Sequence, residues 1–329
     1  MLEGISIKQV SIYCPESVIN NQYFIDHFQK QGIDIKRILK KTGRKKRHVI
    51  EGTKENSLTM AINAAQQAID AASLKSADID LILFSSSTPE YLSPTNSLLI
   101  HKAIKGKDDT LCYDLNGNCI GMFIAVEQAA RTLYDDPDRD RALVIGSDFL
   151  NLWADPSHPI TYSIFGDAAV ALILEKDHSE SGLIDVRYLS DSRFTEEIVY
   201  PAQGLAKSLR DGAEHRYLHW GKFSGIDSVR FAEVSIIELL NKHHLTFEDI
   251  QVYCFSQFTL ANIKLLQAKL NLDQHKIIYV ADEYGYTGTS SPFLALYCAI
   301  EHGLIKRGDN LLFWTLGSGY QAGSMLWRY

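Results

Sequence analysis

Hydrophobic residues fall into two kinds of segment along the chain. Short continuous apolar runs lack the strict alternation of a strand with one wet face, which is typical of strands covered on both sides. The predicted strands are residues 81–84, 142–145, 168–174, 252–255 and 311–316. Longer segments repeat their apolar positions with helical spacing, and the predicted helices are residues 58–72, 120–133, 229–241, 261–270 and 292–303. This alternation of strands and helices predicts an α/β fold with buried sheets.

An internal repeat organises these elements. Residues 74–85 align with residues 245–256 without a gap, and each stretch is typical of a helix end, an acidic turn and a buried strand. The same offset of 171 residues places Cys119 opposite Ser290, and each of these residues begins a helical segment. Two fused copies of one α/β unit explain this pattern.

The repeat divides the chain into two halves. We expect an N-terminal half over residues 1–174, which carries Cys119, and a C-terminal half over residues 175–329. Residues from about 178 to 230 break the repeat and are rich in glycine and polar residues. We interpret them as an insertion in the C-terminal half, whose loops cover one face and shape a substrate entrance.

Composition and charge exclude several classes of protein. Of the 329 residues, 46% are hydrophobic and 22% are charged, which is ordinary for a folded protein with a sizeable core. The formal net charge of -7 argues against binding to nucleic acid or to an anionic membrane. The first seven residues alternate like a strand, and no apolar run is long enough to span a membrane. We therefore expect a cytoplasmic protein.

Cysteine and histidine spacing argues against disulfides and metal centres. The five cysteines are scattered without a paired spacing, so a disulfide framework is not expected. The eleven histidines do not cluster at the spacing of metal ligands. We predict no metal and no other cofactor.

Cys119 lies where a polar turn with flanking glycines runs into an apolar helical segment. A cysteine at a helix start faces unpaired backbone N–H groups and the positive end of the helix dipole, which lowers the pKa of its thiol. Gly117 and Gly121 permit a tight turn and a close approach by a substrate or a neighbouring helix. The alternative interpretation is a small buried core residue, since free cysteine is among the most buried residue types.

Several motifs around Cys119 carry a family resemblance. They are VIGSD at residues 144–148, DP at 155–156, FGDAA at 165–169, LGSGY at 316–320 and KTGR at 41–44. Taken in their order along the chain, these motifs resemble those of the β-ketoacyl-acyl-carrier-protein synthase III family of thiolase-fold condensing enzymes. The resemblance implies a thiolase fold, in which two pseudo-repeated βαβ halves form a layered αβαβα core. It also implies that Cys119 takes an acyl group as a thioester, with the backbone amides of Cys119 and Ser318 as the oxyanion hole.

The chain departs from this family at two catalytic positions. Ser256 stands where the family has a histidine, and Tyr286 stands where it has an asparagine. A hydroxyl and a phenol can donate hydrogen bonds, but neither is a general base near neutral pH at its ordinary pKa. We take Cys119, Ser256 and Tyr286 as the candidate catalytic residues, and the standard decarboxylative reaction is in doubt. A substitute histidine from elsewhere, His158 or His219, is an alternative.

The resemblance also implies where substrates and partners bind. The candidate substrate-binding residues are Lys41, which keeps a positive charge for a phosphate, together with Arg37, Leu92 and Tyr320. Leu92 falls where family members extend a loop residue into the tunnel of the other subunit. The acyl donor is an acyl-carrier protein, whose acidic surface fits the basic residues 36–47, or acyl-CoA. The expected assembly is a homodimer paired along an edge strand, with a heterodimer as the alternative.

Three functions are compatible with these residues. The first is a condensing enzyme or acyltransferase that loads an acyl group on Cys119 and transfers it to a carrier-bound or atypical acceptor. The second is a transferase that forms an ester or an amide without decarboxylation, because the acceptor brings its own nucleophile. The third is a catalytically reduced partner subunit of a heterodimeric ketosynthase.

Overall fold

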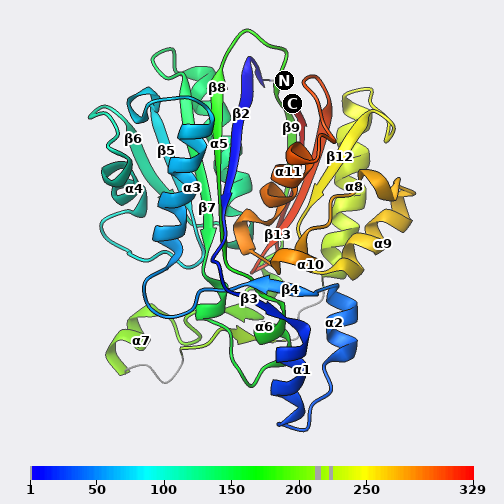
Figure 1. The fold of residues 1–329 in the computed structure, drawn as a ribbon. Helices are drawn as coiled ribbons and strands as arrows, with labels where there is room; N and C mark the ends of the chain where they lie inside the picture. Colours follow the sequence, from blue (N-terminus) through cyan, green and yellow to red (C-terminus); the bar gives the residue numbers. More distant parts are fainter. Residues whose placement is uncertain (1, 212–215, 222–224) are drawn as a thin grey trace.

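Two five-stranded sheets form the centre of the molecule (Figure 1). The structure is a computed structural model that describes residues 2–211, 216–221 and 225–329. The first sheet contains, in spatial order, β2 (Ile5–Tyr13), β8 (Ala168–Lys176), β7 (Arg141–Asp148), β5 (Leu81–Ser85) and β6 (Leu111–Leu115). The second contains β1 (Leu2–Glu3), β9 (Gly182–Ser190), β14 (Gln321–Arg328), β13 (Asn310–Gly317) and β12 (Ile250–Phe255).

The internal repeat of the sequence reappears in the pairing of the strands. In the first sheet β5 is parallel to β7, whereas β7 pairs with β8 and β8 with β2 in antiparallel fashion. In the second sheet β12 is parallel to β13, whereas β13 pairs with β14 and β14 with β9 in antiparallel fashion. The order β2-β8-β7-β5 therefore matches the order β9-β14-β13-β12.

Helices cover both faces of each sheet, as the continuous apolar runs predict. The central layer consists of α5 (Gly121–Asp135) and α11 (Ser291–Glu301), which lie between the sheets (Figure 1). The outer face of the first sheet packs on α3 (Ser57–Ala71) and α4 (Asn96–Ile104), and that of the second packs on α8 (Ile226–Lys242) and α9 (Leu260–Leu270). The predicted layered αβαβα core is thus present.

All ten predicted strands and helices are found, and no end is displaced by more than three residues. The continuous apolar runs become the strands that are buried on both faces. For example, every residue of β5 is buried, and so are the first seven residues of β8.

The predicted insertion starts too early. Its first part forms β9, which pairs with β14 along eight residues of the second sheet. The sequence pattern hides this strand because only its first three residues are fully buried. The irregular excursion begins after Ser190 and contains β10 (Ile198–Val199), α7 (Leu205–Asp211) and β11 (His219–Trp220). Residues 212–215 and 222–224 of the predicted insertion lie outside the described residues.

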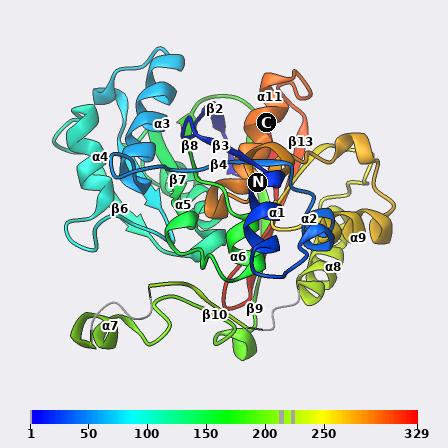
Figure 2. The same ribbon diagram turned by 60° about the horizontal axis from the view of Figure 1, so that its bottom comes forward.

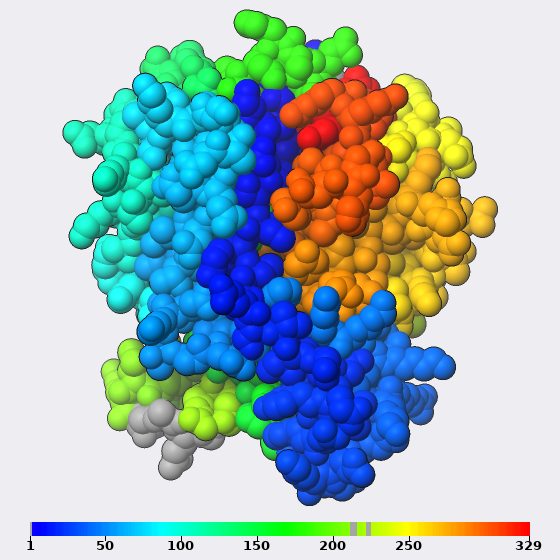
Figure 3. Space-filling view, viewed as in Figure 1, coloured from blue at the N-terminus to red at the C-terminus, as the bar shows by residue number. Residues whose placement is uncertain are grey.

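The remaining elements gather at one end of the two sheets. They are β3 (Val18–Asn20), α1 (Asn21–Gln29), α2 (Lys36–Thr42), β4 (Lys46–His48), α6 (Pro159–Ile164) and α10 (Ala281–Tyr284). Figure 2 turns this end forward and shows α1, α2, α6 and α7 on it. In the space-filling view the N-terminal segment runs between the two halves before it reaches α1 and α2 (Figure 3). No helix within residues 2–211, 216–221 and 225–329 combines the length and the apolar character needed to cross a membrane.

Candidate active site

Cys119 lies in a short 3-10 turn, Asn118–Ile120, that leads into α5. The preceding Asn118 has a φ of +53°, a left-handed conformation that asparagine adopts more readily than most residues. The turn also packs closely on the first sheet, because a Cβ atom on Gly121 would lie 2.2 Å from the Ser85 hydroxyl of β5. The sequence therefore fixes Cys119 against the sheet at the start of the central helix layer.

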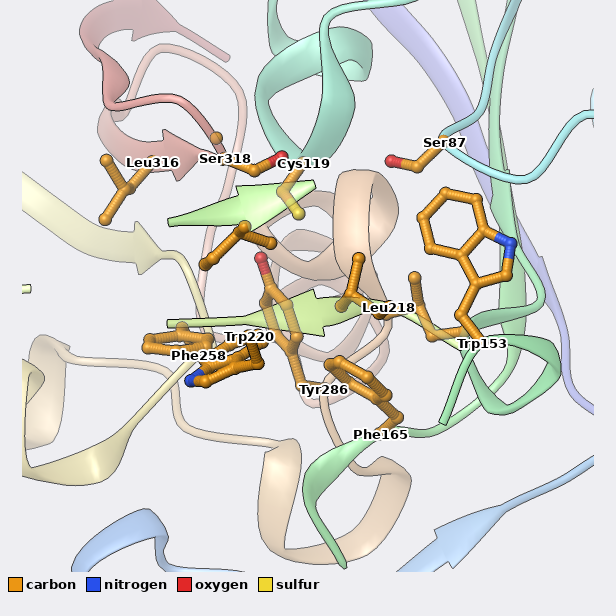
Figure 4. Close-up of a pocket in the computed structure, with 13 residues that line it drawn as sticks. Ser87, Cys119, Trp153, Phe165, Leu218, Trp220, Phe258, Tyr286, Leu316 and Ser318 are labelled. Carbon is orange, nitrogen blue, oxygen red and sulfur yellow. The ribbon is translucent and has the colours of Figure 1, made fainter. Parts of the chain in front are cut away.

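Cys119 lines a cavity with almost entirely apolar walls (Figure 4). The cavity holds about 520 Å³ of empty space, part of which is open to solvent. Its apolar lining consists of Leu150, Trp153, Phe165, Ile198, Leu218, Trp220, Phe258, Leu316 and the ring of Tyr286. These walls fit a hydrocarbon chain, and they remove water from the thiol.

Tyr286 comes from the second half of the chain and points its hydroxyl at the Cys119 sulfur (Figure 4). A short backbone bridge to the first half fixes its position, since the Tyr286 N–H donates to the Ile164 carbonyl at 2.9 Å. The Gly166 N–H donates to the Tyr286 carbonyl at 3.0 Å. Burial, and after it the neighbouring Cys119, raises the pKa of the phenol well above its usual value. Tyr286 is therefore protonated over the physiological range of pH.

The pKa of Cys119 is raised to about 12, mainly because burial disfavours the thiolate and secondly because the Asp148 carboxylate repels it. The Tyr286 hydroxyl and the N–H groups of Ser318 and Cys119 lower this pKa by smaller amounts. The lowered pKa expected from the helix start is thus wrong. Desolvation in the apolar cavity outweighs the favourable contacts of the turn.

Two backbone N–H groups lie at the sulfur, those of Ser318 and of Cys119 itself. Ser318 follows β13 in a turn that packs tightly on the cysteine turn. A Cβ atom on Gly317 would lie only 3.1 Å from the Ile120 side chain and 3.2 Å from the Gly117 carbonyl oxygen. The two amides that the resemblance implies for an oxyanion hole are therefore next to the thiol.

Ser256 is close to this centre but does not line the cavity. Its N–H donates to the Trp314 carbonyl at 2.7 Å, and its side chain is buried. The Ser256 hydroxyl is near enough to lower the pKa of Tyr286. No hydrogen bond of normal geometry forms between them, however, and the Ser256 oxygen is buried without a partner.

Neither candidate substitute histidine belongs to the cavity. The His158 side chain accepts a hydrogen bond from the Thr161 N–H at 3.3 Å and so caps the start of α6. His219 is exposed on β11. Among the described residues, no histidine lines the cavity of Cys119.

Lys41 lines a second, outer cavity, which lies between α2, α6 and α9. Trp220 and Phe258 line both this outer cavity and the Cys119 cavity, so they form the wall between the two. Their rings stack with centroids 5.9 Å apart. Arg37 is exposed on the same helix as Lys41. A substrate arm that reaches from Lys41 to Cys119 has to pass this aromatic pair.

Leu92 lies on the loop before α4 and does not line the Cys119 cavity of its own chain. Its side chain is 73% exposed. Such a position is compatible with a role toward a second subunit, and this role stays a prediction.

Tyr320 does not bind substrate in this arrangement. Its φ of +65° belongs to the turn between β13 and β14 and turns the ring away from the cavity. The ring is fully buried and packs on Phe194 with centroids 4.8 Å apart. Its hydroxyl accepts a hydrogen bond from the Ser228 N–H at 2.7 Å. The assignment of Tyr320 to the substrate is therefore wrong, and the residue anchors the start of α8.

Ser290, the repeat partner of Cys119, does not present its hydroxyl to a substrate. It is fully buried, and its hydroxyl donates to the Thr287 carbonyl at 2.9 Å. Only one of the two matching helix starts thus carries a residue that faces a cavity.

Two buried charged residues hold the site together. Both belong to motifs of the sequence, KTGR and VIGSD, but the sequence does not indicate their roles. Arg44 donates to the carbonyls of Gln257 and Phe258 at 2.8 and 2.9 Å and so fixes the Phe258 wall. Asp148 accepts from the N–H groups of Thr289 and Ser87 at 2.8 and 2.6 Å. It thereby joins loops from both halves behind Cys119. Neither role leaves a periodic signal in the sequence.

The fold and the site together define a class of protein. Two repeated α/β halves, with a cysteine at the start of the central helix and amide donors beside its sulfur, are the arrangement of a thiolase-fold acyltransferase. Residues 113–192 match the family model described as 3-Oxoacyl-[acyl-carrier-protein (ACP)] synthase III, and residues 240–329 match its C-terminal model. The chain belongs to this β-ketoacyl-acyl-carrier-protein synthase III family, and it is an enzyme of the condensing acyltransferase type.

Relatives match along nearly the whole chain. The β-ketoacyl-acyl-carrier-protein synthase III of Coxiella burnetii (strain Dugway 5J108-111) is 28% identical over 320 residues, which cover 97% of this chain and 98% of the relative. The enzyme of Clostridium perfringens (strain SM101) is 26% identical over 334 residues and covers 99% of both chains.

Solved structures confirm the thiolase fold. The 3-oxoacyl-[acyl-carrier-protein] synthase III of Aquifex aeolicus VF5 superposes with a TM-score of 0.85 at 26% identity, covering 99% of this chain and 100% of the other. OleA of Xanthomonas campestris, solved with bound lauric acid and lauroyl-CoA, has a TM-score of 0.87 at 15% identity and covers 100% of both chains. The likeness to OleA concerns the fold alone.

Proposed function

We propose that Cys119 takes an acyl group as a thioester from an acyl-carrier protein or acyl-CoA and passes it to an acceptor. One observation carries this proposal. The Cys119 sulfur meets the Tyr286 hydroxyl and the Ser318 N–H inside an apolar cavity that fits an acyl chain. A nucleophile, a proton-carrying group and an amide donor are the parts that acyl transfer requires.

The first step exchanges one thioester for another. The Cys119 sulfur attacks the carbonyl carbon of the donor, a new S–C bond forms, and the C–S bond of the donor breaks. The amides of Cys119 and Ser318 stabilise the oxyanion of the tetrahedral intermediate. The Cys119 proton ends on the departing thiol, and Tyr286 can relay it because a phenol both donates and accepts a hydrogen bond. Since the thiol is protonated at neutral pH, its proton leaves as the attack takes place.

Lys41 and Arg37 on α2 provide positive charge at the entrance of the donor. Lys41 lines the outer cavity, where the phosphate of a phosphopantetheine arm would lie. The neighbouring basic residues of segment 36–47 are suited to the acidic surface of a carrier protein. The arm reaches Cys119 once Trp220 and Phe258 separate.

A second candidate is transfer without decarboxylation, to an acceptor that brings its own hydroxyl or amine. The specific observation in its favour is that no histidine among the described residues lines the cavity, whereas Tyr286, which stands where the resemblance implies an asparagine, does line it. Tyr286 and Ser256 can donate hydrogen bonds, but they are poor bases at neutral pH. An acceptor with its own nucleophile does not need the histidine and asparagine that Ser256 and Tyr286 replace.

The expected homodimer pairs along β6. Within the described residues β6 pairs only with β5, so its other edge is available for a second copy. Leu111 on this strand is 41% exposed and Leu92 is 73% exposed, which suits a contact that both copies would bury. A molar mass in solution of twice the chain mass is the expected result, and a monomer would contradict it.

The proposed transfer is tested by a two-stage reaction. The purified protein is first incubated with butyryl-carrier protein or butyryl-CoA, and malonyl-carrier protein is then added while carbon dioxide release and the enzyme's mass are followed. An acyl-enzyme that releases carbon dioxide supports condensation. An acyl-enzyme that releases none, but gives its acyl group to an added alcohol or amine, supports the second candidate. If neither donor leaves an acyl group on the protein, the proposal is wrong and the role of a partner subunit stands.

A further inference from the structure

Three hydroxyl residues follow one another directly after β5, and only the outer two have structural partners. The Ser86 hydroxyl donates to the Asp148 carboxylate at 3.2 Å and accepts from the Thr88 N–H at 2.9 Å. The Thr88 hydroxyl accepts from the Phe149 N–H at 2.8 Å. The hydroxyl of Ser87, between them, is buried without a hydrogen-bond partner. A buried hydroxyl without a partner costs free energy, so the fold gains nothing from this one.

The Ser87 side chain is directed into the Cys119 cavity. It lines that cavity and lies across it from the cysteine sulfur (Figure 4). Its backbone is held firmly, because the Ser87 N–H donates to the Asp148 carboxylate at 2.6 Å. Two further hydroxyl residues, Tyr286 and Ser318, line the cavity, and the Tyr286 hydroxyl contacts Cys119. Ser87 therefore offers a hydrogen bond in walls that are largely apolar.

Beside the Cys119 cavity, and also lined by Ser87, is a vestibule with about 1060 Å³ of empty space, part of which is open to solvent. Ser87, Trp153, Leu218 and Ser318 are among the residues that line both spaces. The further walls of the vestibule are polar and include Asn116, Asn118, Ser190, Asp191, Thr195 and Gln321. A chain that leaves the Cys119 cavity on this side thus meets hydrogen-bonding groups, first at Ser87 and then in the vestibule.

We infer that Ser87 recognises an oxygen atom of the substrate, and that the acyl group taken by Cys119 carries a hydroxyl or oxo group close to its thioester. A plain hydrocarbon chain would leave the Ser87 hydroxyl without a partner, whereas an oxygenated chain satisfies it. The inference rests on the proposed function, since it describes the group that Cys119 would carry. It assigns to Ser87 a role in specificity and no part in the chemical step.

The test compares two uncleavable substrate analogues. They are the amides that N-acetylethylenediamine forms with butyric acid and with 3-hydroxybutyric acid, in which nitrogen replaces the thioester sulfur. Their dissociation constants are measured by ligand-observed NMR on the wild type, on Ser87→Ala and on Ser97→Ala. Ser97 is the matched control because its hydroxyl is also buried without a partner but lines neither cavity.

We expect one enantiomer of the hydroxylated analogue to bind the wild type and Ser97→Ala about ten-fold more tightly than the plain analogue. In Ser87→Ala this preference should disappear. A preference that persists in Ser87→Ala, equal binding of both analogues to the wild type, or no binding of either analogue overturns the inference.

The corresponding thioesters separate this outcome from a failure of the proposed function. They are offered to the same three proteins, and the mass gain on Cys119 is recorded. If the analogues show the Ser87-dependent preference but the thioesters leave no adduct, the proposed function fails and the binding role of Ser87 stands. If the wild type forms adducts from the plain and the 3-hydroxylated thioester at the same rate, the inference fails and the proposed function stands.

Discussion

The Tyr286 hydroxyl lies against the Cys119 sulfur, so a side chain from each half of the repeat contributes to this centre. The cysteine comes from the helix start of the first half, and the tyrosine comes from the loop before the matching helix start of the second. Tyr286 is buried and Cys119 is partly buried. Tyr286 lowers the pKa of Cys119, and Cys119 raises the pKa of Tyr286. The reactivity of the thiol therefore depends on a residue that the other half supplies.

Replacing Tyr286 with phenylalanine should slow acylation of Cys119 by about 10²-fold, because the group that relays the proton and contacts the sulfur is lost. The ring itself is kept, and it should still pack on Phe258, whose centroid is 5.4 Å away. The rate is measured by intact mass after mixing with an acyl thioester. An unchanged melting temperature controls for folding, and a rate within about two-fold of the wild type would remove Tyr286 from the mechanism.

The raised pKa of Cys119 predicts how its reactivity varies with pH. Because this pKa is about 12, only a small fraction of the thiol is ionised at neutral pH. Alkylation of Cys119 by iodoacetamide should therefore rise about ten-fold per pH unit between about pH 7 and about pH 10, without a plateau. Cys119→Ala supplies the background from the other cysteines. A plateau that begins below about pH 8 would mean that a thiolate forms readily and that burial does not control the site.

Opening the aromatic wall should change which donors react. Phe258→Ala removes one ring of the pair that separates the Lys41 cavity from Cys119. We expect the acylation rate with butyryl-pantetheine to rise relative to the rate with the shorter butyryl-N-acetylcysteamine, by about ten-fold in the ratio. Removing this half-buried ring should lower the free energy of unfolding by about 3 kcal/mol or less. The ratio of the two rates corrects for this loss, because it affects both donors equally. An unchanged ratio would show that donors enter by another route.

Lys41 should matter only for donors that carry a phosphate. Lys41→Met is expected to raise the KM for acyl-CoA or an acyl-carrier protein by about two- to five-fold, which is the size of effect expected from one exposed charge contact. The KM for an acyl-N-acetylcysteamine, which carries no phosphate, should not change. Lys40→Met is the control, since Lys40 is exposed on the same helix but does not line the outer cavity. Equal effects of the two substitutions would indicate a general effect of charge and no phosphate site at Lys41.

The elements of the fold could be predicted because each is marked by its own periodicity. The runs that become β5 and β8 are continuous and buried on both faces, and the gap-free alignment of residues 74–85 with residues 245–256 revealed the repeat. Strand β9 escaped detection because most of its residues are partly exposed and mix polar with apolar side chains.

The site was only partly predictable, because its walls come from irregular segments. Trp220 and Phe258 lie in loops or very short strands, where no periodicity marks a side chain as facing a cavity. Tyr320 was misassigned because its turn sends the ring into the core. The pKa of Cys119 was predicted in the wrong direction because the helix start is a local feature, whereas desolvation depends on walls that fold in from both halves.

The most direct measurement locates the acyl group itself. The protein is mixed with a butyryl thioester, quenched in acid and digested, and the peptide that contains Cys119 is weighed by mass spectrometry. The account predicts a mass gain equal to the butyryl group on this peptide, its release by hydroxylamine, and its loss in Cys119→Ala but not in Cys112→Ala, which removes another partly buried cysteine. An unmodified Cys119 peptide, or a gain that survives in Cys119→Ala, would contradict it.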